Sequence, residues 1–361
     1  MTGALTTDTN SAKHGVLNYA ADELKACFKD AGIPAFRAAQ VLEWVYRFGQ
    51  TSFYDMTNIG KSLQKRLDEM FYIHRPQIVD VASSSDGTKK FLLRLADATT
   101  VECVYIPDVK RKTICVSSQV GCSVGCKFCN TGYSGFVRNL TAEEIISQFM
   151  VVKDYMGMWS CDDRLSNVVF MGMGEPLLNY QNVMRAIDNM MLDSEAGLSR
   201  RKITLSTSGI SPIIHKVAKD LPCRLAISLH APNDAMRSSI MPINEVYDIR
   251  SIMEACEEYS AHHKFLKITF EYLLLSGIND SKECAIELLN LLRSLNAKIN
   301  LLRFNEWEGC EFKASPGLKV REFANILNDG GLEASIRTRR GADIMAACGQ
   351  LSANSTGTRV V

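Results

Sequence analysis

The sequence lacks the features that mark several large classes of protein. No run of 18 or more apolar residues occurs in the 361 residues, so no membrane-spanning helix and no membrane partner are predicted. The first residues contain no apolar stretch typical of a secretory signal peptide, and we expect a cytoplasmic protein. With 46% hydrophobic and 22% charged residues, the composition excludes disorder, collagen and a coiled coil for most of the chain.

The sequence also lacks an excess of either charge. Lys and Arg number 41, Asp and Glu 40, and the formal net charge is +1. Proteins held on nucleic acid by bulk electrostatics are often strongly basic, so this balance argues against that mode of binding. The charge balance still permits RNA binding through a local basic patch. The candidate patches are the short runs Lys110-Arg111-Lys112 and Arg200-Arg201-Lys202, and the group Arg337, Arg339 and Arg340.

Three different patterns divide the first 107 residues. Residues 1–16 are rich in Thr, Ser and Asn and predict a disordered tail. Over 17–75, apolar residues recur at spacings of three and four, which predicts a small helical domain. Over 76–107 they alternate with polar residues around an Asp86-Gly87 turn, which predicts a β-hairpin or three-stranded extension.

From residue 108 to 341, strand and helix patterns alternate. A capping box at Thr141 and Glu144 begins the first helix. Six strand–helix units predict an α/β fold with an incomplete, open (βα)6 barrel, although a doubly wound sheet has a similar pattern. The unusual residues follow the strands, where α/β barrels place their active sites, so the pattern favours an enzyme. The expected strands span 112–117, 166–171, 202–206, 223–228, 266–273 and 298–303.

Three of the twelve cysteines form a compact group. Cys122, Cys126 and Cys129 have C-x3-C-x2-C spacing, which allows their thiolates to surround one metal centre. A structural zinc site normally has four protein ligands, and no nearby His supplies a fourth. A four-iron cluster also usually takes four cysteines, and three would leave one iron open to a substrate. Coincidental packing is the third interpretation.

The cysteine motif resembles the signature of the radical S-adenosylmethionine (SAM) superfamily, including the aromatic Phe128 before its last Cys. The downstream GMGEP, with Gly172, Gly174 and Glu175, resembles the glycine-rich segment that pairs with the SAM amino group in that superfamily. The resemblance implies one [4Fe-4S] cluster held by the three cysteines. It also implies that SAM binds the open iron and is cleaved there to a 5′-deoxyadenosyl radical.

A larger set of motifs resembles one family over about residues 18–351. VECVYIP, CVSSQVGCSVGCKFCNTG, FMGMGEPLLNY, LAISLHAPND and GADIMAACGQL are similar to the radical-SAM adenosine methyltransferases of 23S rRNA and tRNA, of the dual-specificity RlmN type, and to their sister Cfr. The resemblance implies methylation of adenine C2 in 23S rRNA and tRNA, with two SAM molecules per turnover. It further implies a helical domain that assists RNA binding, an electron donor such as flavodoxin, and a monomer.

The resemblance also implies roles for individual residues. Cys348, in the C-terminal segment 342–361, would carry the methyl group as S-methylcysteine. Glu102 would accept the proton, and Cys115 would release the product through a transient disulfide with Cys348. Without the resemblance, Cys115 is typical of a core residue and Glu102 of a solvated strand residue. The implied SAM contacts are Gly174, Glu175, Ser206, Ser228, Leu229, His230 and Asn305.

One segment departs from the family pattern, and three other functions stay open. EWEGCEFKASP follows Asn305 where the family more often has a loop of the P-x-P-G type. The alternatives are methylation at C8, another radical-SAM reaction, and a zinc-stabilised RNA-binding module. Other radical-SAM reactions often need a second group of cysteines, and no second compact group is present. A brown protein purified without oxygen would separate a four-iron cluster from zinc.

Overall fold

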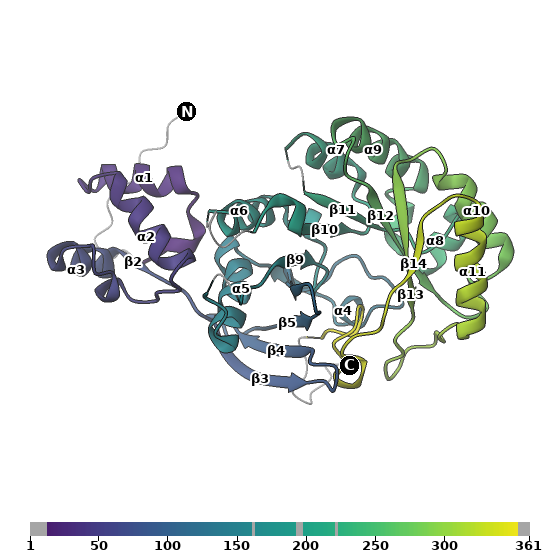
Figure 1. Cartoon of the computed structure of the whole chain (residues 1–361), viewed down its shortest axis with the longest axis horizontal. Helices are drawn as coiled ribbons and strands as arrows, with labels where there is room; N and C mark the ends of the chain where they lie inside the picture. The colour runs from purple at the N-terminus through teal and green to yellow at the C-terminus, as the bar shows by residue number, and fades with distance from the viewer. Residues whose placement is uncertain (1–12, 161–162, 193–197, 221–222, 353–361) are drawn as a thin grey trace.

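The computed structural model describes residues 13–160, 163–192, 198–220 and 223–352, and its centre is a ten-stranded sheet (Figure 1). The strand order is β14-β13-β12-β11-β10-β9-β6-β5-β4-β3. From β6 to β14 all neighbours pair in parallel. These strands are β6 (Lys112–Cys115), β9 (Asn167–Phe170), β10 (Ile203–Thr207), β11 (Arg224–Ser228), β12 (Ile268–Leu274), β13 (Ala297–Arg303) and β14 (Ala334–Ile336).

The predicted α/β class and open barrel are confirmed, with one addition. Each of the six expected strands is present within a few residues of its predicted bounds, and β14 is a seventh. The sequence gives little sign of β14 because it is three residues long and its residues are not buried. Helices follow the strands and cover the outer side of the sheet (Figure 1), as parallel strands that are buried on both faces require. The largest of these are α5 (Ala142–Met156), α6 (Tyr180–Met190), α7 (Ser211–Asp220), α9 (Ile249–His262), α10 (Lys282–Leu292) and α11 (Gly317–Asp329).

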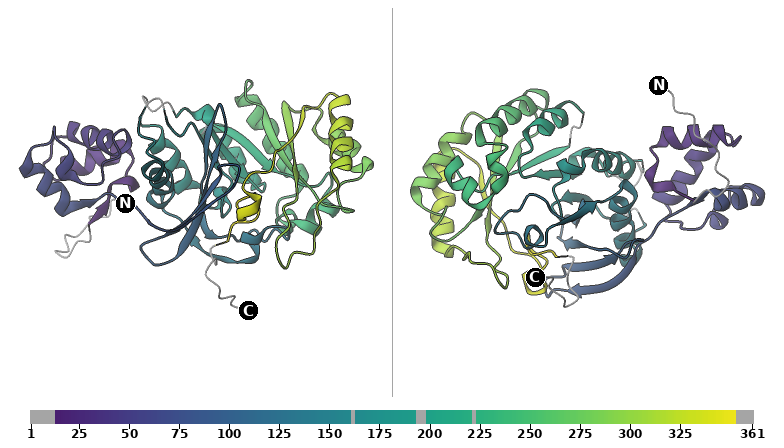
Figure 2. Two further views of the ribbon diagram at one scale, coloured as in Figure 1. Left: turned by 60° about the horizontal axis from the view of Figure 1, so that its bottom comes forward. Right: turned by 180° about the vertical axis from the view of Figure 1, so that it is seen from behind.

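The predicted β-extension continues the same sheet instead of forming a separate bridge. Its strands β3 (Gln77–Ser83), β4 (Lys89–Arg94) and β5 (Thr100–Pro107) pair antiparallel, and β5 joins β6 with Val104 opposite Cys115. The C-terminal segment passes beside the β3–β4 end of this extension (Figure 2). There, Ser84 donates a hydrogen bond to the Asp343 carboxylate at 2.6 Å. The extension therefore links two parts of the chain that are 259 positions apart in sequence.

The N-terminal helices form a small unit at one end of the molecule (Figure 1). They are α1 (Ala21–Asp30), α2 (Phe36–Tyr46) and α3 (Lys61–Met70), packed around apolar side chains such as Phe28 and Val41. The prediction of a disordered tail over residues 1–16 is wrong for its last residues. His14–Gly15 form strand β1, which pairs with β2 (Phe71–Tyr72), and Val16 is fully buried. Residues 1–12 lie outside the described part of the chain.

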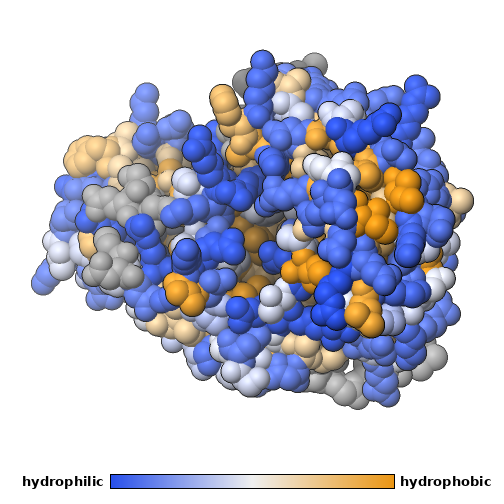
Figure 3. All heavy atoms as spheres, turned by 45° about the vertical axis from the view of Figure 1, so that its right-hand side comes forward, coloured by the Kyte–Doolittle hydropathy of each residue, from blue (hydrophilic) through white to orange (hydrophobic). Residues whose placement is uncertain are grey.

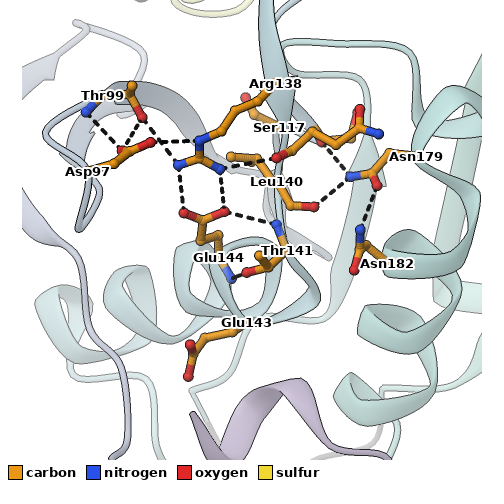
Figure 4. Close-up of polar contacts among 12 residues, drawn as sticks. Asp97, Thr99, Ser117, Arg138, Leu140, Thr141, Glu143, Glu144, Asn179 and Asn182 are labelled. Atoms are coloured by element: carbon orange, nitrogen blue, oxygen red, sulfur yellow. Dashed lines mark hydrogen bonds and ion pairs between the residues drawn. The ribbon is translucent and has the colours of Figure 1, made fainter. Parts of the chain in front are cut away.

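A polar network fixes the start of α5 beside the sheet (Figure 4). The predicted capping box is confirmed, because the Thr141 hydroxyl accepts from the Glu144 amide at 3.2 Å and the Glu144 carboxylate accepts from the Thr141 amide at 2.9 Å. Arg138, in β8 (Phe136–Asn139), donates to both Glu144 oxygens and to Asp97. The strand pair that carries the cysteine loop, β7 (Gln119–Gly121) with β8, is thereby joined to α5 and to the β4–β5 turn.

Candidate active site

One cavity brings together residues from the carboxyl ends of five neighbouring strands. Its walls come from segments at or after β9, β10, β11, β12 and β13, from the loop after β7, and from the C-terminal segment. This is the edge at which the sequence placed the active site. The face in Figure 3 is mostly hydrophilic, and hydrophobic side chains gather around a hollow near its middle. The predicted site residues that line the cavity are Cys122, Cys126, Cys129, Gly172, Gly174, Glu175, Ser206, Ser228, His230 and Cys348.

The cysteine loop is held in shape by its backbone. The Cys122 amide donates to the Gly135 carbonyl at 2.8 Å, and the Cys129 amide donates to the Cys126 carbonyl at 3.0 Å. Gly121 has a φ of 75°, and a Cβ there would lie 1.9 Å from the Gly135 carbonyl oxygen, so the turn requires glycine. The loop then enters α4 (Asn130–Tyr133) directly after Cys129. All three thiols therefore face one space.

The three thiols line one cavity, and three cysteines suit a four-iron cluster whose fourth iron stays open to a ligand. A zinc ion would need its ligands to converge on one point, whereas each cysteine of an iron–sulfur cluster binds a different iron. Burial raises the pKa of all three thiols, that of Cys122 to about 12. A bound cationic centre would offset this, because a coordinating thiol loses its proton.

The glycine-rich segment after β9 lies against the segment that precedes the cysteine loop. Gly174 has a φ of 97°, and a Cβ there would lie 2.5 Å from the Gln119 side chain. The Glu175 amide donates to the Gln119 side chain at 2.9 Å. The Glu175 carboxylate is buried and accepts from the Ser208 and Leu177 amides at 2.6 and 3.0 Å. Glu175 thus ties this segment to the end of β10, and the close approach explains why Gly174 is a glycine.

His230 is a neutral hydrogen-bonding group in the cavity wall. Burial lowers its pKa to about 3, so the ring is uncharged at neutral pH. Its Nδ1 accepts from the Leu273 amide at 3.0 Å, which places the ring proton on Nε2. The ring meets Phe128 edge to face, with centroids 5.0 Å apart. The residue has a left-handed backbone with a φ of 59°, a conformation that costs energy in a residue other than glycine.

Two predicted SAM contacts are not part of the cavity wall. Leu229 is fully buried, and its amide and carbonyl are taken by the Glu271 carbonyl and the Arg237 guanidinium. Asn305 follows Phe304, which lines the cavity, but its own side chain does not. The Asn305 Oδ1 atom is buried without a hydrogen-bond partner in the described structure, and so is the Ser208 hydroxyl in the cavity wall. Unsatisfied buried polar atoms of this kind fit a site that a polar ligand completes.

The C-terminal segment places Cys348 beside the cysteine loop. The Asn130 amide donates to the Gly349 carbonyl at 2.7 Å, and the Thr131 hydroxyl donates to the Leu351 carbonyl at 2.6 Å. Cys348 is a surface residue that lines the cavity, and the protein atoms packed around its thiol, followed by Glu271, raise the pKa of that thiol. Helix α4 therefore fastens the segment that carries Cys348 to the loop that carries the other three cysteines.

Cys115 and Glu102 lie behind the cavity wall on adjacent strands. Cys115, at the end of β6, is buried, and its thiol pKa is raised by burial and then by nearby Cys348. The fold thus brings two cysteines near each other that are 233 positions apart (348 − 115). Glu102, on β5, is 1% exposed, so the interpretation as a solvated strand residue is wrong. Its carboxylate pairs with Lys90 at 2.9 Å and accepts from the Ser352 amide at 2.8 Å.

The sequence did not reveal two buried charged groups of the site. Glu271 lines the cavity and accepts from the Asn300 side chain at 2.8 Å. A carboxylate inside the apolar strand LKITFEYL was a signal that could have identified it. Arg237, in α8 (Asp234–Ile240), is fully buried and donates to the carbonyls of Ser208, Ser228 and Leu229. Arg237 is part of the motif LAISLHAPND..R..IMPIN that resembles the family, but the sequence gives it no role beyond that match.

Replacing Arg237 by Met should destabilise the protein by about 3 kcal/mol or more, because three buried carbonyls lose their donor and each unsatisfied group costs about 1–3 kcal/mol. Urea unfolding of the purified protein would measure the change. Arg250→Met is the control, since Arg250 is exposed and makes only a surface ion pair with Glu254, and its loss should cost under about 1 kcal/mol. Equal midpoints for the two variants would contradict the scaffold role of Arg237.

The unusual loop after Asn305 contacts both the cysteine loop and the C-terminal segment. The Trp307 indole donates to the Phe128 carbonyl at 3.0 Å, and the Gln350 side chain donates to the Glu306 carbonyl at 3.2 Å. The Glu306 carboxylate is occupied by Lys313 and by the Ala314 amide. The loop therefore supports the site although it lacks the P-x-P-G pattern that the family more often has.

The three candidate basic patches differ in their surroundings. Arg111 and Lys112 pair with Asp108 and Asp163, so two of the three cations in the first run have acidic neighbours. Arg200 and Arg201 are exposed and precede β10. Arg337 and Arg339 are exposed after β14, and Arg339 donates to the carbonyl of Phe304 in the cavity wall. The last group is the one closest to the cavity.

Comparison with known proteins identifies two parts of the chain. Residues 15–73 match the model of the ribosomal RNA large subunit methyltransferase N-terminal domain, and residues 116–289 match that of the radical SAM superfamily. No helix in the described ranges has the length and apolar character needed to cross a bilayer.

Individual relatives match over nearly the whole chain. The dual-specificity RNA methyltransferase RlmN of Rhodospirillum rubrum is 46% identical, with 97% of this chain and 83% of the relative covered. That of Phenylobacterium zucineum is 45% identical, with 93% and 90% covered. The crystal structure of a radical SAM methyltransferase from Sphaerobacter thermophilus is 37% identical and superposes with a TM-score of 0.88, covering 94% of this chain and all of that one.

Proposed function

This chain belongs to the RlmN family of radical-SAM, dual-specificity RNA methyltransferases, and we propose that it methylates C2 of one adenosine in 23S rRNA and in tRNA through a methyl group carried on Cys348. The observation that carries the proposal is a single cavity shared by the three cysteines of the radical-SAM motif, the GMGEP segment and Cys348. An electron donor such as flavodoxin, a monomeric state and a cytoplasmic location complete the proposal.

The chain provides places for both cofactors of the radical SAM family, a [4Fe-4S] cluster and SAM. Cys122, Cys126 and Cys129 would hold the cluster. When bound, the two cofactors supply the methyl group and the radical that activates it. The SAM contacts that we propose are Gly174, Glu175, Ser206, Ser228 and His230 in the cavity wall, with Leu229 supporting them from behind and Asn305 as the residue with an unsatisfied amide oxygen.

The remaining roles follow from positions around the cavity. Cys348 is open to the cavity, where its sulfur can take up and present a methyl group. Glu102, whose carboxylate touches the segment that carries Cys348, is the proposed proton acceptor. Cys115 is the proposed resolving thiol because it is a neighbour of Cys348. The target adenine has to leave its stack to reach this space.

Mass spectrometry of nucleosides tests the proposal. Reconstituted protein, SAM and a reductant are incubated with 23S rRNA fragments or with tRNA, and 2-methyladenosine is expected from both. An RNA in which the target adenosine is replaced by guanosine is the control and should stay unmodified. Formation of 8-methyladenosine would show that the methylated carbon is C8 and not C2. Unmodified RNA together with active SAM cleavage would overturn the RNA methyltransferase assignment of this site.

A further inference from the structure

Glu102 and Lys90 together hold both ends of the segment that carries Cys348. One Glu102 oxygen accepts from the Ser352 amide at 2.8 Å, and the other pairs with the Lys90 ammonium at 2.9 Å. The same ammonium donates to the Met345 carbonyl at 3.3 Å. The pair therefore contacts the chain three residues before Cys348 and four residues after it.

The strand register explains how the two side chains meet. Leu92 pairs with Glu102 and Lys90 with Val104, so Lys90 and Glu102 are diagonal neighbours on one face of the β4–β5 pair. Val104 lies opposite Cys115 on β6, which places Cys115 on that face as well. Lys89, the preceding residue, points to the other face and its ammonium donates to Ser83. Lys89 therefore cannot replace Lys90, because its side chain lies on the opposite face of the strand pair.

The charges around Glu102 oppose one another. Burial raises the pKa of the Glu102 carboxyl, and Asp80 on β3 raises it further. Lys90 and the Ser352 amide lower it, and so offset part of the burial. Cys103 on the adjacent position has a thiol pKa raised well above its usual range, so it stays neutral beside Glu102. Lys90 is the cation whose ion pair with Glu102 counteracts the burial of that carboxylate.

The segment that carries Cys348 depends on its hydrogen bonds to the sheet. Its only regular structure among the described residues is the short turn Ala342–Ile344, and Met345 has a left-handed φ of 54°. A non-glycine residue in that conformation persists only when its surroundings hold it there. The Lys90 bond to the Met345 carbonyl is such a contact.

We propose that Lys90 is a positioning residue that keeps Glu102 ready to accept a proton. Through its ion pair with the Glu102 carboxylate, Lys90 also fastens the Cys348 segment to the sheet. The proposal rests on the proposed function, in which Glu102 accepts the C2 proton of the adenine that the transferred carbon joins to Cys348. Loss of this proton together with one electron, for which the iron–sulfur cluster would be the acceptor, restores the aromatic ring. When the carboxylate gains that proton, it loses its attraction to Lys90 and becomes a weaker acceptor for Ser352. Proton transfer then loosens the segment at the stage when Cys348 has to reach Cys115.

The test compares Lys90→Gln, Lys90→Arg and the neighbouring control Lys89→Gln in reconstituted full-length protein. Without Lys90, the pKa of Glu102 rises and less of the carboxyl is ionised at neutral pH. Methylation by Lys90→Gln should therefore fall about 10- to 100-fold at neutral pH, somewhat less than the 10²–10⁴-fold that a general base usually contributes. The acidic limb of the pH–rate profile of Lys90→Gln should move to higher pH. Lys90→Arg should restore most of the methylation rate.

A second measurement does not depend on activity. Hydrogen exchange of the peptide that contains Ser352 should be faster in Lys90→Gln than in wild type and unchanged in Lys89→Gln. A pH profile and exchange rate equal to wild type would overturn the proposal, and so would equal losses in Lys89→Gln. If wild-type protein makes no methyladenosine, the proposed function fails, while the exchange rates still decide whether Lys90 holds the segment.

Discussion

Replacing Cys126 by Ala should remove bound iron and abolish the conversion of SAM to 5′-deoxyadenosine. Cys126 lies between the other two cysteines in the loop and lines the cavity with them. Two thiols cannot hold a four-iron cluster with one iron left open, because three irons need protein ligands in that arrangement. Iron content, absorbance of the anaerobically purified protein and chromatography of the SAM products would measure the effect.

Cys256→Ala is the matched control for this experiment. Cys256 is a buried cysteine of α9 that packs in the core and does not line the cavity. Its variant should keep the iron and the brown colour, at some cost in stability from the small space that the sulfur leaves. A Cys126→Ala protein that still produces 5′-deoxyadenosine would contradict the assignment of the cluster ligands. A colourless wild-type protein that contains zinc would favour the RNA-binding module instead.

The main strands and helices could be predicted from the sequence because hydrophobic patterns repeat along it. Each long parallel strand is an apolar run, as for Leu205 in β10 and Ile299 in β13, and both residues are fully buried. A capping box needs only two residues three apart, so Thr141 and Glu144 could be identified locally. Strand β14 could not, since a three-residue strand is too short to show a hydrophobic period.

The site was predictable where function requires an unusual local spacing. The three cysteines and the GMGEP glycines satisfy this condition, and the structure places them around one cavity. Lys90 and Glu271 do not, because each acts through partners distant in sequence. The Lys90 contact with Met345, for example, spans 255 positions. Their surroundings are created by the fold, and no short stretch of sequence records them.

Replacing Cys115 by Ala should leave RNA covalently attached to Cys348, visible as a slowly migrating band on a denaturing gel. In the proposed reaction the carbon added to adenine is still joined to Cys348 by a thioether bond, which water does not readily cleave. The Cys115 thiol can attack the Cys348 sulfur. A sulfur–sulfur bond then forms, the sulfur–carbon bond breaks, and the carbon leaves with the thiol proton as a methyl group. Without Cys115, this release step has no nucleophile.

Cys348→Ala provides the complementary result for the same step. It should give neither methylated RNA nor the slow band, while iron content stays at the wild-type level, since Cys348 is not one of the three proposed ligands. The double variant Cys115→Ala with Cys348→Ala should also lack the band, which would place the attachment on Cys348. Release through a disulfide requires the two Cα atoms to come within about 7 Å. Cys115 lies on the sheet face that Lys90 and Glu102 connect to the C-terminal segment, which favours that approach. Normal turnover by Cys115→Ala would make Cys115 an ordinary core residue of β6, and methylation by Cys348→Ala would mean that the methyl group passes from SAM without a protein carrier.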